Sequence, residues 1–465
     1  FRFFAFFALV FGLYWALRDN RHRKSLLLLA SYVFYGAWDW RFLGLILFIT
    51  IVSYLVGNAV RRDGVTDRAR RTWLTFGILS SLGVLFTFKY FNFFADSFAD
   101  LAGVIGLPAG QVTLNLVLPV GISFYTFQAI SYMVDVARGS VKADRSKLDV
   151  AFYIAFFPQL VAGPIVRAAD FIPQMETARL WKDVNVRACL ALFLIGFIKK
   201  ACISDNIAPY VDVIFASPET FNAASIVAGV LLYATQIYCD FSGYSDMAIA
   251  IAGLLGYKFQ ANFDSPYFSP NIQDFWRRWH ISLSSWLRDY LYIPLGGNRQ
   301  GEARRNVNLM TTMVLGGLWH GASFNFIIWG VLHGGALTVE RVWNRFVSPR
   351  FPAMGTLGTV LGVAVTFYWV CLAWIFFRAA DLPAALGMAK TYLTWTSDGT
   401  RSLALYMWTL IAVLGIVHYL GHRYDALGRL SRLKPQSFAI TYGVLFAVAL
   451  SFVPLGSRPF IYFQF

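Results

Sequence analysis

The stretch from Leu309 to Leu332, LMTTMVLGGLWHGASFNFIIWGVL, decides the fold and the function that we predict for this chain. It is apolar and long enough to cross a bilayer, which takes about 20 helical residues, yet its middle holds an imidazole, His320. An ionisable side chain within such a segment is costly and is a functional candidate by default. Gly316, Gly317 and Gly321 flank it, so the helix can break there and another molecule can approach the backbone closely.

The composition predicts a polytopic membrane protein. Of the 465 residues, 57% are hydrophobic and 18% are aromatic, and apolar stretches follow one another almost end to end. The net charge of +15 comes from Lys and Arg in short loops, which is typical of cytoplasmic loops and not of a nucleic-acid-binding surface. We therefore expect an all-α protein with about ten to twelve transmembrane helices and no nucleic-acid partner.

The charges of the loops predict the topology. Arginine-rich loops after Leu17 and Val60 are expected in the cytoplasm, and alternation of the segments leaves both termini outside. Two segments break the alternation. Val150 to Val166 is interrupted by two prolines and a glycine, and the His320 segment has basic residues on both sides. Each is expected to be re-entrant or broken, and the His320 segment is either a hairpin or two crossings.

A polar patch lies inside the apolar segment from Ala224 to Leu255. Such a patch needs a cavity or partners within the protein. Its members are Tyr238, Asp240, Ser242, Tyr244, Ser245 and Asp246.

The segment from Gln273 to Tyr292, QDFWRRWHISLSSWLRDYLY, is too polar to span a membrane but has a strong helical periodicity. Its aromatic and leucine side chains fall on one side at about 100° per residue, and its charged side chains fall on the other. We predict a cytoplasmic interfacial amphipathic helix with Arg and Trp as anchors. His280 falls toward the apolar side and is expected to point into protein or membrane, not at water.

Two histidines are candidate catalytic residues. Neutral imidazole can take a hydroxyl proton while the oxygen attacks an acyl carbonyl, so His320 is a candidate general base. The alternative is a core histidine that bonds across helices. His280 is a candidate for orienting an acyl thioester or stabilising its developing charge, and its alternative is a residue of the interfacial aromatic belt. His333 follows His320 outside any simple metal spacing, so no metal site is expected.

The segment around and after His280 is also where a cytoplasmic polyanion such as coenzyme A would be attracted. The arginines there are chiefly a topology signal, and the Gly296-Gly297-Asn298 turn either binds an anion or only ends the helix. The candidate donor-binding residues are Trp276, Arg278, Arg288, Asn298 and Arg299.

Several of these segments match a known family. DFWRRWHISLSSWLRDYLYIPLGGNR (Asp274 to Arg299) and LGGLWHGASFNFIIWGVLHG (Leu315 to Gly334) closely resemble the membrane-bound O-acyltransferase (MBOAT) family, and most of all its alginate O-acetyltransferase branch. Further similarity lies in LPVGISFYTFQAISYMVDV, FFPQLVAGPIVR, YCDFSGYSDMAI and the terminal YFQF. The resemblance covers nearly the entire chain, so we expect one membrane-embedded domain over residues 1–465.

The resemblance implies a site and a function. It implies that His320 is the catalytic histidine, that His280 is the second polar position, and that helices surround a funnel or tunnel with His320 near its narrowest point. It implies a cytoplasmic acetyl donor, acetyl-CoA or another activated acetyl group. We expect no covalently bound cofactor. The acceptor would be an extracytoplasmic acetyltransferase partner or the exopolysaccharide itself. The expected location is the bacterial inner membrane, in contact with lipid.

Acetyl transfer has three rival functions. D-alanyl transferases of the teichoic acid type share the RRWHISLS helix and take their acyl group from a carrier protein. Acetyl transfer is preferred because LRDYLYIPLGGNR and YFQF match the alginate branch more closely. A transporter could use His320 and the polar patch as a substrate path, but no internal repeat is evident. A structural scaffold gives no reason for an imidazole among glycines.

Overall fold

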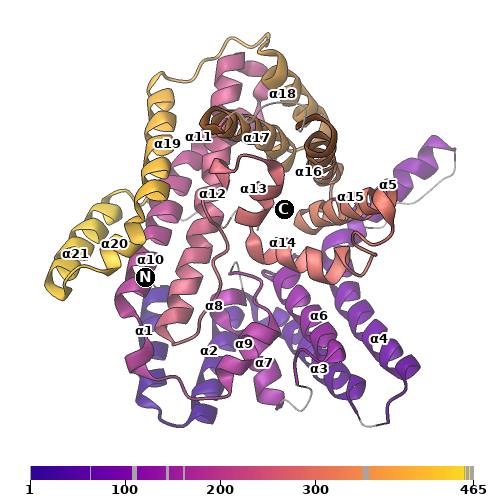
Figure 1. Cartoon of the computed structure of the whole chain (residues 1–465), viewed down its shortest axis with the longest axis vertical. Coiled ribbons are helices and arrows are strands. Elements are labelled where there is room, and N and C mark those ends of the chain that lie inside the picture. The colour runs from indigo at the N-terminus through magenta and orange to yellow at the C-terminus, as the bar shows by residue number, and fades with distance from the viewer. Residues whose placement is uncertain are drawn as a thin grey trace. The chain divides into compact units, whose positions relative to one another are not determined.

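The computed structural model of the chain describes residues 2–62, 64–106, 113–142, 146–160, 163–348, 355–454, 456 and 460. Within these ranges the regular structure is helical apart from an isolated bridge between Phe221 and Arg401, so the all-α prediction is confirmed. The helices, which Figure 1 labels, group into two compact units. One comprises residues 1–186 and 248–260, and the other comprises residues 187–247 and 261–465. The single membrane-embedded domain over residues 1–465 stays a prediction.

The first unit packs apolar helices at points where one of them carries a glycine. Its helices are α1 Arg2–Ala16, α2 Asn20–Asp39, α3 Leu43–Val60, α4 Asp67–Leu85, α5 Phe91–Val104, α6 Ile122–Arg138, α7 Lys147–Ala155, α8 Phe157–Leu160 and α9 Ala168–Met175. Helices α3, α4 and α6 contact one another. A Cβ atom on Gly57 of α3 would lie 3.0 Å from Tyr132 Oη of α6, so a larger residue here would require the Tyr132 side chain to shift by a few tenths of an ångström.

The interruption predicted between Val150 and Val166 is present in the first unit. Helix α7 ends at Ala155, and α8 is a separate single turn. Beyond it, a Cβ atom on Gly163 would lie 2.5 Å from Gln159 Cα, so the chain folds back tightly on itself. The break is therefore confirmed, and the return of this segment to the same side of the membrane stays a prediction.

The second unit contains the histidine-bearing segments. Its elements are α10 Val186–Phe197, the π-helix η4 Ile198–Ser204, α11 Asp205–Ala216, α12 Ala223–Leu254, α13 Ile272–Arg278, α14 Ile281–Leu287, the π-helix η7 Arg288–Tyr292, α15 Gly301–His320, α16 Phe324–Val342, α17 Gly355–Arg378, α18 Leu382–Thr394, α19 Tyr406–Tyr424, α20 Ala426–Ser431 and α21 Pro435–Ser451. The last residues of α12, from position 248, belong to the first unit.

Several helices have the length and surface of membrane-spanning segments. In the described ranges, four stretches are long and apolar enough to cross a membrane: Asn20–Val60, Asp67–Val104, Ala223–Leu254 and Gly355–Arg378. Large apolar side chains cover their outer faces, for example Leu79 at 62% and Val365 at 69% exposure. Faces of this kind suit lipid and not water. These helices agree with a multi-pass protein, and the count of ten to twelve crossings stays a prediction.

Candidate active site

His320 is the last residue of α15 and lies at the tip of a helical hairpin. Helix α15 ends there and α16 begins at Phe324, so the predicted break near the histidine is confirmed (Figure 1). The imidazole is only 3% exposed. Its ring centroid lies 4.9 Å from that of Trp319, 5.0 Å from Trp329 and 5.1 Å from Phe377. His320 therefore lies at the end of α15 that carries the partial negative charge of the helix dipole.

Glycines hold the two helices of the hairpin in backbone contact. A Cβ atom on Gly317 would overlap the carbonyl oxygen of Phe326, and one on Gly330 would lie 2.5 Å from the carbonyl oxygen of Met313. Gly317 of α15 faces Phe326 of α16, and Met313, earlier in α15, faces Gly330, later in α16. The two helices therefore run antiparallel. Gly321 has extended backbone, but a Cβ atom there would overlap the Phe326 ring. The close approach at these glycines is made by the neighbouring helix, and approach by another molecule stays a prediction.

The segment predicted as one amphipathic helix is broken at the second histidine. Helix α13 ends at Arg278, Trp279 is extended, and His280 has left-handed backbone with φ 43° before α14 begins at Ile281. The prediction of a continuous interfacial helix is therefore wrong. Tertiary packing overrides the periodicity, because Trp279 is buried and its ring lies 4.9 Å from that of Trp374. The expectation that His280 avoids water is confirmed, since its side chain is fully buried.

Two neighbours define how the His280 ring is held. Phe241 meets it edge to face, with centroids 4.6 Å apart, and Asn262 Oδ1 lies 3.3 Å from its Nδ1. His280 lies outside the four stretches that could span a membrane. Burial lowers the pKa of its imidazole to about 3, because the charged form is poorly solvated there. His280 is therefore a neutral hydrogen-bonding group at physiological pH and not a cation.

One tryptophan joins the two candidate catalytic histidines. The Trp319 ring centroid lies 6.0 Å from that of His280 and 4.9 Å from that of His320. The structure thus brings together two residues that are 40 positions apart in the sequence. They form one buried site lined by aromatic side chains.

Trp276 and His333 extend the aromatic wall of this site. The Trp329 ring, already next to His320, lies 5.7 Å from Trp276 and 4.6 Å from His333. His333 is fully buried, and neither of its ring nitrogens has a hydrogen-bond partner in the described part of the chain. From the sequence, His333 was a candidate only for a metal ligand, and its place in this aromatic wall was not predicted. Its signal was the four-residue spacing from Trp329, which puts both side chains on one helix face.

The other candidate donor-binding residues are not brought to the histidines. Arg278 pairs with Asp274 at 2.7 Å, and Arg288 pairs with Asp289 at 2.6 Å. Within the described ranges, no hydrogen bond or ring contact joins the four remaining candidates to His280 or His320. These candidates are Arg278, Arg288, Asn298 and Arg299, of which the last three are exposed.

The two carboxylates of the polar patch in α12 have partners within the protein, as predicted. Lys200 Nζ lies 2.5 Å from a carboxylate oxygen of Asp240 and 2.7 Å from one of Asp205, while Lys199 Nζ lies 2.8 Å from Asp246. Both lysines belong to the π-helix η4, whose wider turn lets adjacent side chains reach α12. Sequence analysis did not identify the lysines, although two consecutive cations after an apolar run were a signal for buried acidic partners.

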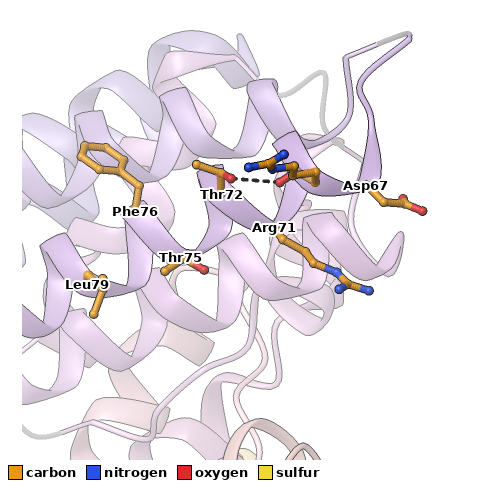
Figure 2. A pocket seen from close by; sticks show the side chains of 7 residues that line it. Asp67, Arg71, Thr72, Thr75, Phe76 and Leu79 are labelled. Atoms are coloured by element: carbon orange, nitrogen blue, oxygen red, sulfur yellow. Dashed lines mark hydrogen bonds between the residues drawn. The ribbon is translucent and has the colours of Figure 1, made fainter.

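A surface hollow of about 610 Å³ lies along α4 in the first unit (Figure 2). Its side chains all come from this one helix, and Thr72 Oγ1 donates a hydrogen bond to the Arg68 carbonyl at 3.0 Å. The lining residues are Asp67, Arg68, Arg71, Thr72, Thr75, Phe76 and Leu79. The hollow contains neither candidate catalytic histidine.

No metal-binding cluster stands out in the part of the chain that the structure describes. There, no three His, Cys, Asp or Glu side chains gather closely enough to hold a metal ion. The four cysteines are all free thiols. That the protein needs no metal stays a prediction.

Residues 142–380 match MBOAT, the membrane-bound O-acyltransferase family. This range contains the hairpin and both candidate histidines. The probable alginate O-acetylase AlgI of Pseudomonas aeruginosa is 42% identical over 428 residues, which cover 90% of this chain and 80% of that protein. The chain belongs to the membrane-bound O-acyltransferase family. The resemblance found in the sequence, including that to the alginate branch, is therefore confirmed.

Two other relatives have names that specify different substrates. A peptidoglycan O-acetyltransferase of Helicobacter pylori is 37% identical, with 79% of this chain and 73% of that protein covered. A teichoic acid D-alanyltransferase of Bacillus subtilis is 29% identical, with 57% of this chain and 69% of that protein covered. The protein is thus a multi-pass membrane O-acyltransferase, and the transporter and scaffold alternatives are set aside.

Proposed function

We propose that this O-acyltransferase passes an acetyl group from cytoplasmic acetyl-CoA to a hydroxyl of an extracytoplasmic acceptor, in the O-acetylation of an exopolysaccharide such as alginate. The acceptor is the polysaccharide or a partner acetyltransferase. The observation that carries the proposal is the buried His320 at the hairpin tip, joined to His280 through Trp319. The identity of 42% with a probable alginate O-acetylase supports the acetyl group and the polysaccharide.

In the proposed mechanism, His320 is a general base. Its neutral ring takes the proton of the acceptor hydroxyl while the oxygen bonds to the thioester carbonyl carbon. The carbon–sulfur bond then breaks, the leaving thiolate takes up the proton, and free coenzyme A departs. The C-terminal end of α15 stabilises the imidazolium that exists between these steps. In an alternative route, His320 itself carries the acetyl group from donor to acceptor.

The aromatic side chains around His320 would exclude water from the site of acetyl transfer. Trp319, Trp329 and Phe377 cover the imidazole, so a bound thioester would be shielded from hydrolysis. His280 positions the substrates beside this base.

The wider architecture that we propose is a funnel of ten to twelve helices in the bacterial inner membrane, with both termini outside and His320 at the narrowest point.

The donor is proposed to enter from the side that carries the basic loops. Exposed Arg299 would bind the phosphates of coenzyme A together with Asn298 and Arg288, of which Arg288 would exchange its ion pair with Asp289 for a phosphate, and Arg278 lies on the preceding helix. Trp276 contacts the wall that includes Trp329, so it would line the donor's path toward His320. These residues therefore stay the proposed donor-binding set.

D-alanyl transfer from a carrier protein is the second candidate function. The identity of 29% with a teichoic acid D-alanyltransferase supports it, but over 57% of this chain only. The alginate O-acetylase relative matches at higher identity over 90% of the chain. We therefore favour acetyl-CoA as the donor.

A transfer assay with purified protein tests the proposed function. Protein in nanodiscs is given acetyl-labelled acetyl-CoA and an alginate oligosaccharide, with and without a partner acetyltransferase, and label on the sugar is measured. We expect transfer by the wild type and its loss in His320→Ala. His22→Ala is the matched control, because this imidazole is 74% exposed. Transfer at the wild-type rate by folded, donor-binding His320→Ala would overturn the role of His320.

A further inference from the structure

Asn262 lies before α13 and is almost completely buried. Its side-chain oxygen, Oδ1, faces the backbone N–H of Ser282 at 3.1 Å and the Ser282 hydroxyl at 2.9 Å. A backbone N–H can only donate, so the atom that faces it must be the amide oxygen. On its other side, Asn262 Nδ2 donates to Ser245 Oγ at 3.2 Å. These contacts fix the orientation of the amide.

The fixed amide determines which nitrogen of His280 carries the hydrogen. Nδ1 lies 3.3 Å from Asn262 Oδ1 and 3.5 Å from Ser282 Oγ, whose own hydrogen is donated to Asn262. Both neighbours are acceptors toward Nδ1, so Nδ1 must be the protonated nitrogen. Burial keeps the ring neutral, since it lowers the pKa of His280 to about 3. Nε2 therefore bears a lone pair, and it is buried with no hydrogen-bond partner among the described residues.

The backbone around His280 is fixed by the same asparagine. Ile281 donates its N–H to the Asn262 carbonyl at 2.9 Å, directly after the left-handed residue His280. A non-glycine residue adopts such a conformation only where its surroundings impose it. Phe241, edge-on at 88°, sets the plane of the imidazole from another side. The direction of Nε2 is thus set by packing and hydrogen bonds together.

We propose that Asn262 is a positioning residue that holds His280 in the Nδ1–H form, so that Nε2 accepts a hydrogen bond from an O–H or N–H group of a bound substrate. A thioester carbonyl is excluded as the partner of Nε2, because both are acceptors. The role differs from one of the two that the sequence predicted for His280, namely the stabilisation of charge on the carbonyl. It rests on the proposed function in one respect, namely that substrate reaches His280.

Nitrogen NMR of the imidazole tests the tautomer without any substrate. Protein labelled with ¹⁵N at histidine is compared with His280→Gln, and the difference spectrum gives the two ring nitrogens of His280. We expect a protonated Nδ1 and an unprotonated Nε2 at neutral pH, and loss of this pattern in Asn262→Leu. A protonated Nε2 in the wild type overturns the proposal. This result stands whether or not the protein transfers acetyl groups.

Kinetics then identify the substrate group that Nε2 meets. Asn262→Leu should lower kcat/KM by about 10- to 100-fold, as removal of groups that orient a functional histidine does elsewhere. Asn262→Asp keeps an oxygen toward Nδ1–H and should retain most of the activity. Ser245→Ala is the matched control, because it removes only the contact at the far end of the amide. Each variant is first required to unfold at a temperature close to that of the wild type.

The two sources of the donating group give different results. A raised KM for the sugar acceptor in Asn262→Leu assigns the hydrogen bond to a hydroxyl, and a raised KM for acetyl-CoA assigns it to an amide N–H of the donor. Unchanged kinetics in folded Asn262→Leu overturn the proposed role. Absence of transfer by the wild type would count against the proposed function alone, because the tautomer is measured separately.

Discussion

A Cβ atom on Gly317 would overlap the carbonyl oxygen of Phe326, so α15 and α16 touch through their backbones just below the His320 tip. Gly317→Ala should push the helices apart and lower stability by about 1–3 kcal/mol, as overpacking in a close-packed interior does. The displaced hairpin tip should also reduce acetyl transfer. The apparent melting temperature in detergent and the transfer rate in nanodiscs measure the two effects.

Gly335→Ala is the matched control for this prediction. Gly335 lies in α16, the other helix of the hairpin, and a Cβ atom there would meet nothing within 4 Å. This substitution should be neutral or should stabilise the helix by about 0.5–1 kcal/mol, since alanine has the higher helix propensity. Equal effects of the two substitutions would contradict the argument from backbone contact.

Loss of the Lys200 ion pairs should be among the single changes that most reduce the stability of the second unit. Its ammonium lies between the carboxylates of Asp240 and Asp205, and the Lys200 and Asp240 side chains are 9% and 3% exposed. Lys200→Met leaves the buried carboxylate of Asp240 and the partly buried carboxylate of Asp205 without this cation, which should cost roughly 3–5 kcal/mol. Thermal unfolding and the yield of folded protein report the loss.

A compensating variant separates charge from packing at this position. Lys200→Met combined with Asp240→Asn and Asp205→Asn removes the carboxylate charges as well and should regain most of the stability. Arg41→Gln is the control, because it breaks an ion pair whose arginine side chain is 67% exposed, and it should change the melting temperature little. No recovery in the triple variant would mean that the lysine acts through packing and not through charge.

The break at His320 could be predicted from sequence because its signals are local, whereas the choice between a hairpin and two crossings stayed open. An imidazole among glycines, with basic residues on both sides, indicated a broken segment, and α15 ends at His320. Helix α17 was predicted from Leu357 to Phe377 and runs from Gly355 to Arg378, because a long apolar run has one stable conformation in a membrane.

The geometry of His280 could not be predicted, because it is set by residues distant in the sequence. Helical periodicity continued through His280, but Asn262 binds the backbone on its C-terminal side and Trp279 packs against Trp374. The lysine partners of α12 were missed for the same reason. A single sequence shows that Asp240 needs a partner, but only the packing of η4 identifies it as Lys200.

Donor binding can be measured apart from catalysis. Acetyl-CoA at 100 times its Kd should stabilise the protein by about 2.7 kcal/mol, since it binds the folded state alone. His320→Ala should keep this protection, whereas Arg288→Ala with Arg299→Ala should weaken it if these exposed arginines bind phosphates. Protection by a small acyl carrier protein, and none by acetyl-CoA, would favour D-alanyl transfer instead.

The native His333 is expected to lower the stability of the protein and to contribute to its function. Its imidazole is fully buried against Phe275, Trp276 and Trp329, and neither nitrogen has a hydrogen-bond partner within the described ranges. His333→Phe keeps a ring that can stack on Phe275 and removes the unsatisfied polar atoms. The variant should therefore gain about 1–3 kcal/mol in stability.

Acetyl transfer by His333→Phe should fall, by about tenfold, if the polar ring is there to contact substrate near the shared Trp329 wall. His422→Phe is the matched control, because that exposed imidazole also stacks on a phenylalanine, Phe268, at 5.1 Å. It should change neither quantity, since an exposed imidazole is already hydrated. A lower melting temperature with unchanged transfer in His333→Phe would instead mean that His333 serves packing alone.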